Sequence, residues 1–160
     1  MDSSLSGSLE EILISIQHHD QGIRRSGEIQ LHLFQSLPEY IGIATKFASD
    51  DSKLVHFRQL VILLLNQQIS KDWTTFPKVS KDLLVQFSLN CCSNNVTAIR
   101  HITMITLSKI VLRSSAAECG DILKYLSGQL SVPDIFVVTS TLRCLCAIAE
   151  EGKEASFFNN

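Results

Sequence analysis

The five cysteines are the first candidates in this chain for metal binding or nucleophilic catalysis. They stand as Cys91–Cys92 and Cys144-x-Cys146, with Cys119 between the two groups. These cysteines are not accompanied by a second pair of ligands at zinc-finger spacing, and residues 144 and 146 would point to different sides of a helix. Buried cysteine behaves as a small hydrophobic side chain. We therefore expect no metal site and interpret the cysteines as core residues.

The five histidines and the glycines give no sign of catalysis. The histidines are scattered along the chain, and none forms a His-x-x-x-His pair or stands beside a reactive-looking cysteine. The glycines are isolated, so no glycine-rich phosphate loop exists. Catalysis requires a nucleophile or an acid–base pair in a pocket, and the sequence pattern indicates neither. We expect a protein that is not an enzyme and needs no cofactor.

Composition narrows the class of protein further. The 160 residues are 45% hydrophobic and 19% charged, which is too apolar for a disordered chain. A net charge of −2 predicts no direct nucleic-acid binding. The longest apolar run, Leu60 to Leu65, is far shorter than the ~20 residues of a membrane span. The first residues lack a signal peptide, and with an odd number of cysteines this predicts a reducing compartment, the cytoplasm or nucleus.

Apolar residues recur at helical spacing along most of the chain and predict eight helices. Ser8–Glu11 and Ser115–Glu118 have the pattern of capping boxes, and Asp20 stands before the second helix. Pro38, Pro77 and Pro133 all stand near expected helix starts. The fourth helix is expected from about residue 53 to residue 73.

The expected helices form four hairpins whose first helices recur about every 40 residues, near Pro38, Pro77 and Glu118. This period is typical of HEAT repeats. The second helix of a pair is apolar on more than one side, as in residues 61–65, whereas a compact four-helix bundle needs one apolar stripe per helix. We predict an all-α, right-handed α-solenoid of about four HEAT-type hairpins. Residues 1–152 form the repeat domain, and residues 153–160 are interpreted as a truncated tail.

The stretch from Arg58 to Trp73 resembles the second repeat of importin-β-type nuclear transport receptors (karyopherins). Those receptors carry an Arg-x-Leu, apolar, Lys-Asn-x-Ile, Trp/Tyr pattern there. Pro38-Glu39-Tyr40 is similar to their first inter-repeat loop, and Ile99-Arg100 has the spacing of transportin-type members. The resemblance covers roughly residues 8–150. One departure is Asn66-Gln67 in place of Lys-Asn, which removes a cation from the inner surface.

The resemblance implies a function in nucleocytoplasmic protein transport. In these receptors, the second (B) helices of the N-terminal repeats bind the small GTPase Ran in its GTP form. Nucleoporins and protein cargo are partners of the full-length receptor. In the same proteins, the positions of Arg58 and Arg100 support packing between repeats and loops. The chain is then expected to be the N-terminal piece of a receptor in the cytoplasm and nucleus.

Helical spacing selects the polar rows that would contact Ran, because residues three, four, seven or eleven apart share a helix face. We expect these rows to face solvent on the inner side of the B helices. An ordinary solvated face is the alternative for each row. The candidates are Gln59, Asn66 and Ser70 on the second B helix, Thr106, Lys109 and Arg113 on the third, and Thr139 and Arg143 on the fourth.

Two other interpretations stay open from the sequence. The chain can be a generic helical-repeat scaffold or adaptor that binds a peptide or protein in its groove. It can also be a fragment or splice product without binding activity, which predicts a partly unfolded monomer. The sequence alone names neither a cargo nor a direction of transport.

Overall fold

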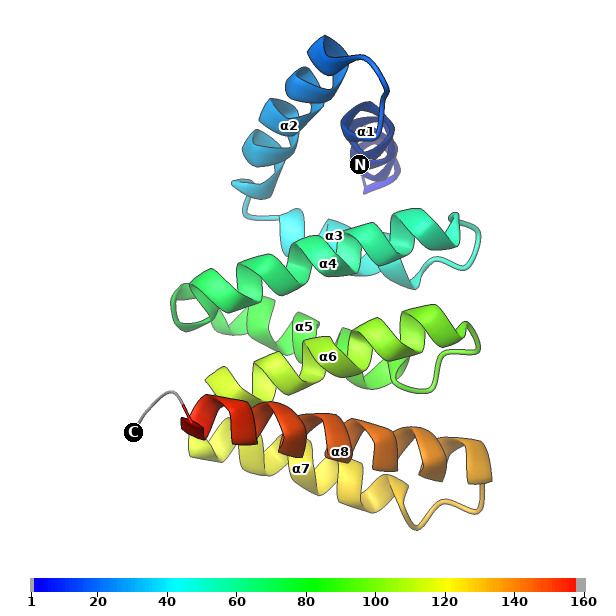
Figure 1. The fold of residues 1–160 in the computed structure, drawn as a ribbon, viewed down its shortest axis with the longest axis vertical. Helices are drawn as coiled ribbons and strands as arrows, with labels where there is room; N and C mark the ends of the chain where they lie inside the picture. Colours follow the sequence, from blue (N-terminus) through cyan, green and yellow to red (C-terminus); the bar gives the residue numbers. More distant parts are fainter. Residues whose placement is uncertain (1, 158–160) are drawn as a thin grey trace. The chain divides into compact units, whose positions relative to one another are not determined.

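The computed structural model describes residues 2–157, with side chains for residues 6–150. The described residues form eight α-helices and one short 3-10 helix, and no strand occurs among them, so the all-α prediction and the number of helices are confirmed (Figure 1). The elements are α1 (Asp2–Ile16), α2 (Gln21–Gln35), α3 (Tyr40–Ser49), α4 (Val55–Asp72), η1 (Trp73–Thr75), α5 (Lys78–Cys91), α6 (Thr97–Arg113), α7 (Ala116–Gln129) and α8 (Ile135–Phe157).

Several helices begin where the sequence places a capping residue. The Asp20 carboxylate accepts a hydrogen bond from the Ile23 amide at the start of α2, at 3.0 Å. Ser115 and Glu118 form the predicted capping box at the start of α7. Asp134 caps α8 by accepting from the Phe136 amide at 2.8 Å. These side chains satisfy amides that have no partner within the first turn of a helix.

One predicted helix start is wrong. Ser8 lies inside α1, which begins at Asp2, so the Ser8–Glu11 pattern is not a cap. The polar residues before Ser8 continue the helix instead of ending it. The last helix continues to Phe157, which includes residues 153–157 of the expected tail, and residues 158–160 lie outside the described residues.

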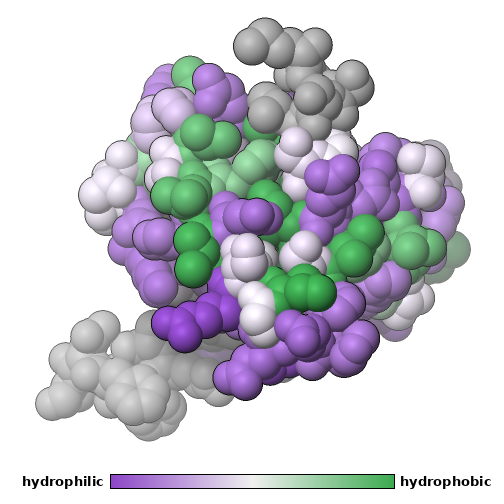
Figure 2. All heavy atoms as spheres, turned by 90° about the horizontal axis from the view of Figure 1, so that it is seen from above, coloured by the Kyte–Doolittle hydropathy of each residue, from purple (hydrophilic) through white to green (hydrophobic). Residues whose placement is uncertain are grey.

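The chain divides into two compact units, Met1–Val61 and Ile62–Asn160, and α4 runs from the first into the second. In the first unit α1 packs against α2 and α3. Gly27 of α2 permits this close approach, because a Cβ at that position would lie 2.8 Å from Ser15 Cβ. Leu9, Leu13 and Phe47 are buried in the core. Figure 2 shows apolar side chains mixed with polar ones on the face at the α1–α2 end.

Arg58 is almost completely buried in the first unit and has a structural role. Its Nε donates to the Ala48 carbonyl at 2.9 Å, and its guanidinium lies 2.8 Å from the Asp51 carboxylate. The side chain thereby ties α4 to the end of α3 and to the loop between them. These contacts agree with the packing role that the family resemblance implies at this position.

In the second unit α5 pairs with α6, α7 pairs with α8, and α6 also packs against both α7 and α8. Figure 1 shows α6 and α8 side by side, with α5 and α7 behind them. The buried apolar side chains of this unit include Leu84, Ile99, Leu107, Ile122 and Leu126. Burial of one such side chain stabilises the folded state by roughly 1.5–3 kcal/mol. The buried contacts on several sides of α6 explain why its sequence lacks a single apolar stripe.

Arg100 holds the loop between α5 and α6 in place, as Arg58 does for the loop between α3 and α4. Its guanidinium donates to the Asn94 carbonyl at 2.6 Å and to the Thr97 hydroxyl at 3.1 Å. The same group lies over the ring of Phe136, 5.0 Å from the ring centre, at the start of α8. One buried arginine therefore connects a loop, α6 and α8, in line with the expected packing role.

Candidate partner-binding surface

The predicted binding residues lie on three helices, and all but Gln59 belong to the second unit. Ser70, Arg113 and Arg143 are exposed, and Gln59, Lys109 and Thr139 are half-buried. The prediction that the whole set faces solvent is wrong for Asn66 and Thr106, which are 4% and 0% exposed. The surface available to a partner is therefore smaller than the predicted one.

The burial of these two residues has different consequences. The Thr106 hydroxyl donates to the Ile102 carbonyl at 3.0 Å, so the helix itself supplies its partner. Thr103 and Ser108 do the same with carbonyls four residues earlier. The Asn66 Oδ1 atom has no hydrogen-bond partner among the described residues. Helical spacing shows on which face of a helix a polar residue lies. It does not show whether the helix backbone satisfies a hydroxyl and so allows the side chain to be buried.

The structure brings Ser70, Lys109 and Arg113 together at the contact between α4 and α6. Lys109 Nζ lies 3.5 Å from the Ser70 hydroxyl. Arg113 donates to the Lys109 carbonyl at 3.3 Å, so its guanidinium lies along its own helix. Neither cation is paired with a carboxylate within the described part of the chain. We use the name cationic ridge for Lys109 and Arg113 with the adjacent Ser70, together with Arg143, which lies on α8 and lines the groove described next.

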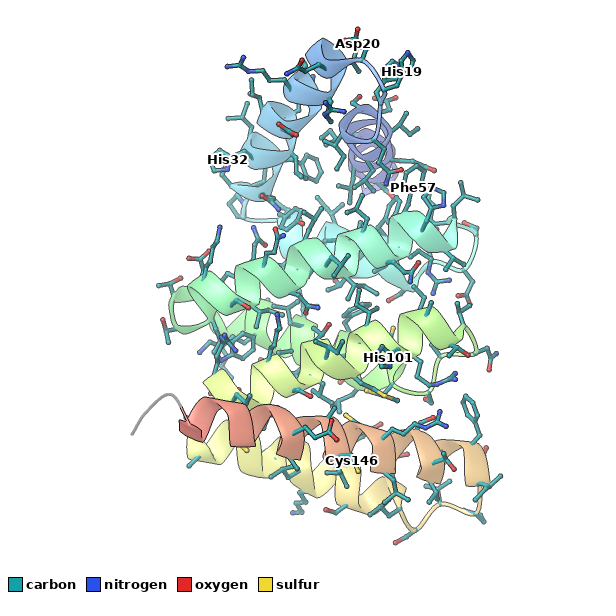
Figure 3. The ribbon with its side chains drawn as sticks, in the orientation of Figure 1. His19, Asp20, His32, Phe57, His101 and Cys146 are labelled. Carbon is teal, nitrogen blue, oxygen red and sulfur yellow. The ribbon has the colours of Figure 1, made fainter. Side chains whose placement is uncertain are left out.

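A groove of about 470 Å³ lies between α6 and α8. Its apolar lining includes Met104 and Ile105 from α6 and Leu142 and Ala147 from α8; its polar lining is His101, Thr139, Arg143 and Glu150, and Cys146 completes it. In Figure 3 the labelled His101 and Cys146 mark the two helices that bound it. Ile105, Lys109 and Arg113 follow at four-residue intervals, so the groove and the cationic ridge share one face of α6.

Sequence reasoning found Thr139 and Arg143 but missed the apolar part of the groove. Leu142 is 49% exposed, although its spacing fits the buried stripe of α8. Only the position of α6 beside α8 decides which apolar side chains remain open. An apolar residue directly next to a predicted surface arginine was the one available signal.

The cysteines do not behave as one group. Cys91, Cys92 and Cys144 are buried, as predicted, Cys119 is half-buried, and the prediction is wrong for Cys146, which is exposed in the groove. Within residues 6–150, metal-binding side chains do not gather in groups of three or more. The groove and the ridge of the second unit combine cationic and apolar side chains.

Comparisons with known protein families and curated proteins do not assign this chain to a family. A scan against protein-family models gives no match, and a search of curated proteins finds no significant match. Among the described helices, none has both the length and the apolar character needed to cross a membrane.

Proposed function

We propose that this chain is the N-terminal HEAT-repeat segment of an importin-β-type transport receptor and that it binds Ran in its GTP form. The proposal includes the right-handed solenoid, with α6 and α8 as B helices of successive repeats. It also includes a location in the cytoplasm and nucleus. Nucleoporins and cargo would be partners of the full-length receptor, not of this segment alone.

The packing of the second unit supports the repeat part of this proposal. Two helical hairpins, α5–α6 and α7–α8, contact each other mainly through their second helices. In a HEAT array the second helices of successive repeats form one layer and the first helices form the other. The buried arginines Arg58 and Arg100 agree with the resemblance, because each secures the loop that precedes a second helix.

The observation that carries the binding part is the cationic ridge beside an open groove. Lys109, Arg113 and Arg143 present positive charge without carboxylate partners in the described residues. An acidic surface on a partner would pair with them, and electrostatic complementarity of this kind governs specificity and association rate. Asn66 and Thr106 are removed from the contact set because a partner cannot reach them without local rearrangement. Gln59, in the first unit, stays a separate candidate.

A pull-down with Ran locked in its GTP and GDP forms tests the proposal. We expect capture of the GTP form only. Lys109→Glu and Arg143→Glu should each weaken capture at least tenfold, whereas Lys124→Glu, at an exposed position on α7, should leave it unchanged. Equal capture of both forms, or no capture of either, would contradict Ran binding by this chain.

The groove itself favours a second candidate function, a scaffold that binds a peptide between α6 and α8. Its volume of about 470 Å³ lies within the range of ordinary ligand sites. Leu142→Asp should abolish peptide binding because it places a charge in the apolar part. A signal on a peptide array that this variant loses, together with no Ran binding, would favour the scaffold over the receptor.

A further inference from the structure

Two thiols from different helices meet in the core of the second unit. Cys92 is the C-cap residue of α5, and Cys144 lies in α8, 52 residues later in the chain. Their sulfur atoms are 3.9 Å apart, and both residues are buried. We propose that Cys92 and Cys144 are an oxidisable pair that a hydroperoxide converts into a disulfide between α5 and α8. This inference is independent of the proposed Ran binding.

The geometry requires only a small movement. A disulfide has a sulfur–sulfur distance of about 2.05 Å, so the two atoms must approach by about 2 Å. Cys92 ends its helix and is followed by a turn, so it is not held on both sides by helical backbone. Adjustment of the Cys92 side chain and the end of α5 can therefore close the distance while α8 keeps its position.

The contact between the thiols also prepares one of them to react. The Cys92 S–H donates a hydrogen bond to Cys144 Sγ, which lowers the pKa of Cys144 and raises that of Cys92. The thiolate is the nucleophilic form of cysteine. Because the two sulfur atoms are in hydrogen-bond contact, whichever thiol is oxidised first has its resolving partner beside it.

A small cavity gives access to Cys92, whose sulfur lies 3.9 Å from that of Cys144. It has a volume of about 30 Å³ and reaches Cys92 between the end of α5 and α8. Ser93, Ser140 and Thr141 supply polar groups to its lining. This is the volume that one water molecule occupies in the liquid. A compact polar oxidant such as hydrogen peroxide fits this route far better than oxidised glutathione.

The reaction balances with one peroxide. The thiolate of one cysteine of the pair attacks one peroxide oxygen, the O–O bond breaks, and hydroxide leaves, which forms a sulfenic acid on that cysteine. The sulfur of the other cysteine then attacks the sulfenic sulfur, the S–O bond breaks, and hydroxide leaves with the proton of that second thiol as water. Two thiols are oxidised, and one hydrogen peroxide is reduced to two waters.

The cross-link would enclose α6 and α7 and fix α8 to the end of α5. Because α6 and α8 form the groove, oxidation would hold its two sides in one arrangement. Closure of a loop of this length restricts the unfolded chain, so the oxidised protein should be the more stable form. In a reducing compartment such a bond would form transiently, during exposure to peroxide.

The test uses the full chain with Cys91, Cys119 and Cys146 changed to Ala, which leaves only the proposed pair. After stoichiometric hydrogen peroxide, we expect maleimide labelling to disappear, the monomer mass to fall by two hydrogens, and dithiothreitol to reverse both changes. Thermal unfolding followed by the fluorescence of the single tryptophan, Trp73, should shift upward by roughly 10 °C. Oxidised glutathione at the same concentration should give neither change.

A matched control is Cys92→Ser in the same background, which should leave Cys144 without a resolving thiol and give no upward shift. Persistent maleimide labelling of both cysteines would overturn the proposal. So would over-oxidation without a link, or addition of glutathione to either cysteine. If the triple variant does not fold, peroxide-treated wild-type chain is digested with trypsin, and fragment ions must show Cys92 in peptide 82–100 joined to Cys144 in peptide 144–153. Absence of that joined peptide would equally overturn it.

Discussion

Replacement of Arg58 tests whether this buried arginine stabilises the first unit through a backbone carbonyl or through its ion pair. Arg58→Ala removes the Nε hydrogen bond to Ala48 and the contact with Asp51. A hydrogen bond from a charged group contributes about 1.5–3 kcal/mol, and loss of the buried methylenes costs about 2 kcal/mol more. Release of the ordered side chain offsets up to about 2 kcal/mol. The expected loss in free energy of unfolding is therefore about 1.5–5 kcal/mol.

The ion pair itself should contribute little, because the Asp51 side chain is 82% exposed. Exposed pairs are worth about 0–1 kcal/mol, so Asp51→Ala should cost less than 1 kcal/mol. Arg58→Met keeps the apolar stem and isolates the loss of the hydrogen bonds. Urea denaturation followed by circular dichroism measures all three variants. If Asp51→Ala costs as much as Arg58→Ala, or Arg58→Ala costs under 1 kcal/mol, this reasoning is refuted.

Three further substitutions probe single features, each by the same urea denaturation. Burial raises the pKa of Tyr40 to about 12, above its ordinary value of about 10. The neutral phenol therefore contributes fully to the free energy of unfolding below pH 10. As pH rises from 10 to 12 the protein should lose up to about 3 kcal/mol of that free energy. Tyr40→Phe should remove that part of the alkaline loss, and an unchanged pH profile would count against it. Gly27→Ala should destabilise the first unit by at least 1 kcal/mol, because its Cβ meets Ser15, and an unchanged midpoint would disprove the close approach. Ser115→Ala should cost about 1 kcal/mol through loss of the α7 cap, and no change would mean that water replaces it.

The sequence predicted those parts of the fold that local chemistry decides. Asp20 and Ser115 cap helices because each side chain reaches amides within three residues, and that distance is set by the chain itself. Ser8 shows the limit of the same argument. Its capping-box pattern lies within α1, where the residues before it are also helical.

The candidate surface was only partly predictable, because it depends on contacts between helices. Arg113, Arg143 and Ser70 are exposed, as the polar rows on their helices predicted. Thr106 was assigned to the surface because of its polarity, yet its hydroxyl is satisfied by α6 and the side chain is buried. Leu142 is the opposite case, because its spacing predicts a core residue but its side chain lines the groove. The Cys92–Cys144 contact, across 52 residues, has no local signature at all.

Quantitative binding of Ran to the purified chain tests the central proposal most directly. Titration calorimetry with Ran locked in either nucleotide state gives both affinity and stoichiometry. We predict one Ran bound per chain in the GTP form, binding that weakens as salt is raised, and no measurable binding of the GDP form. The same affinity for both nucleotide states, or no binding of the GTP form by a chain that circular dichroism shows to be folded, would contradict the proposal.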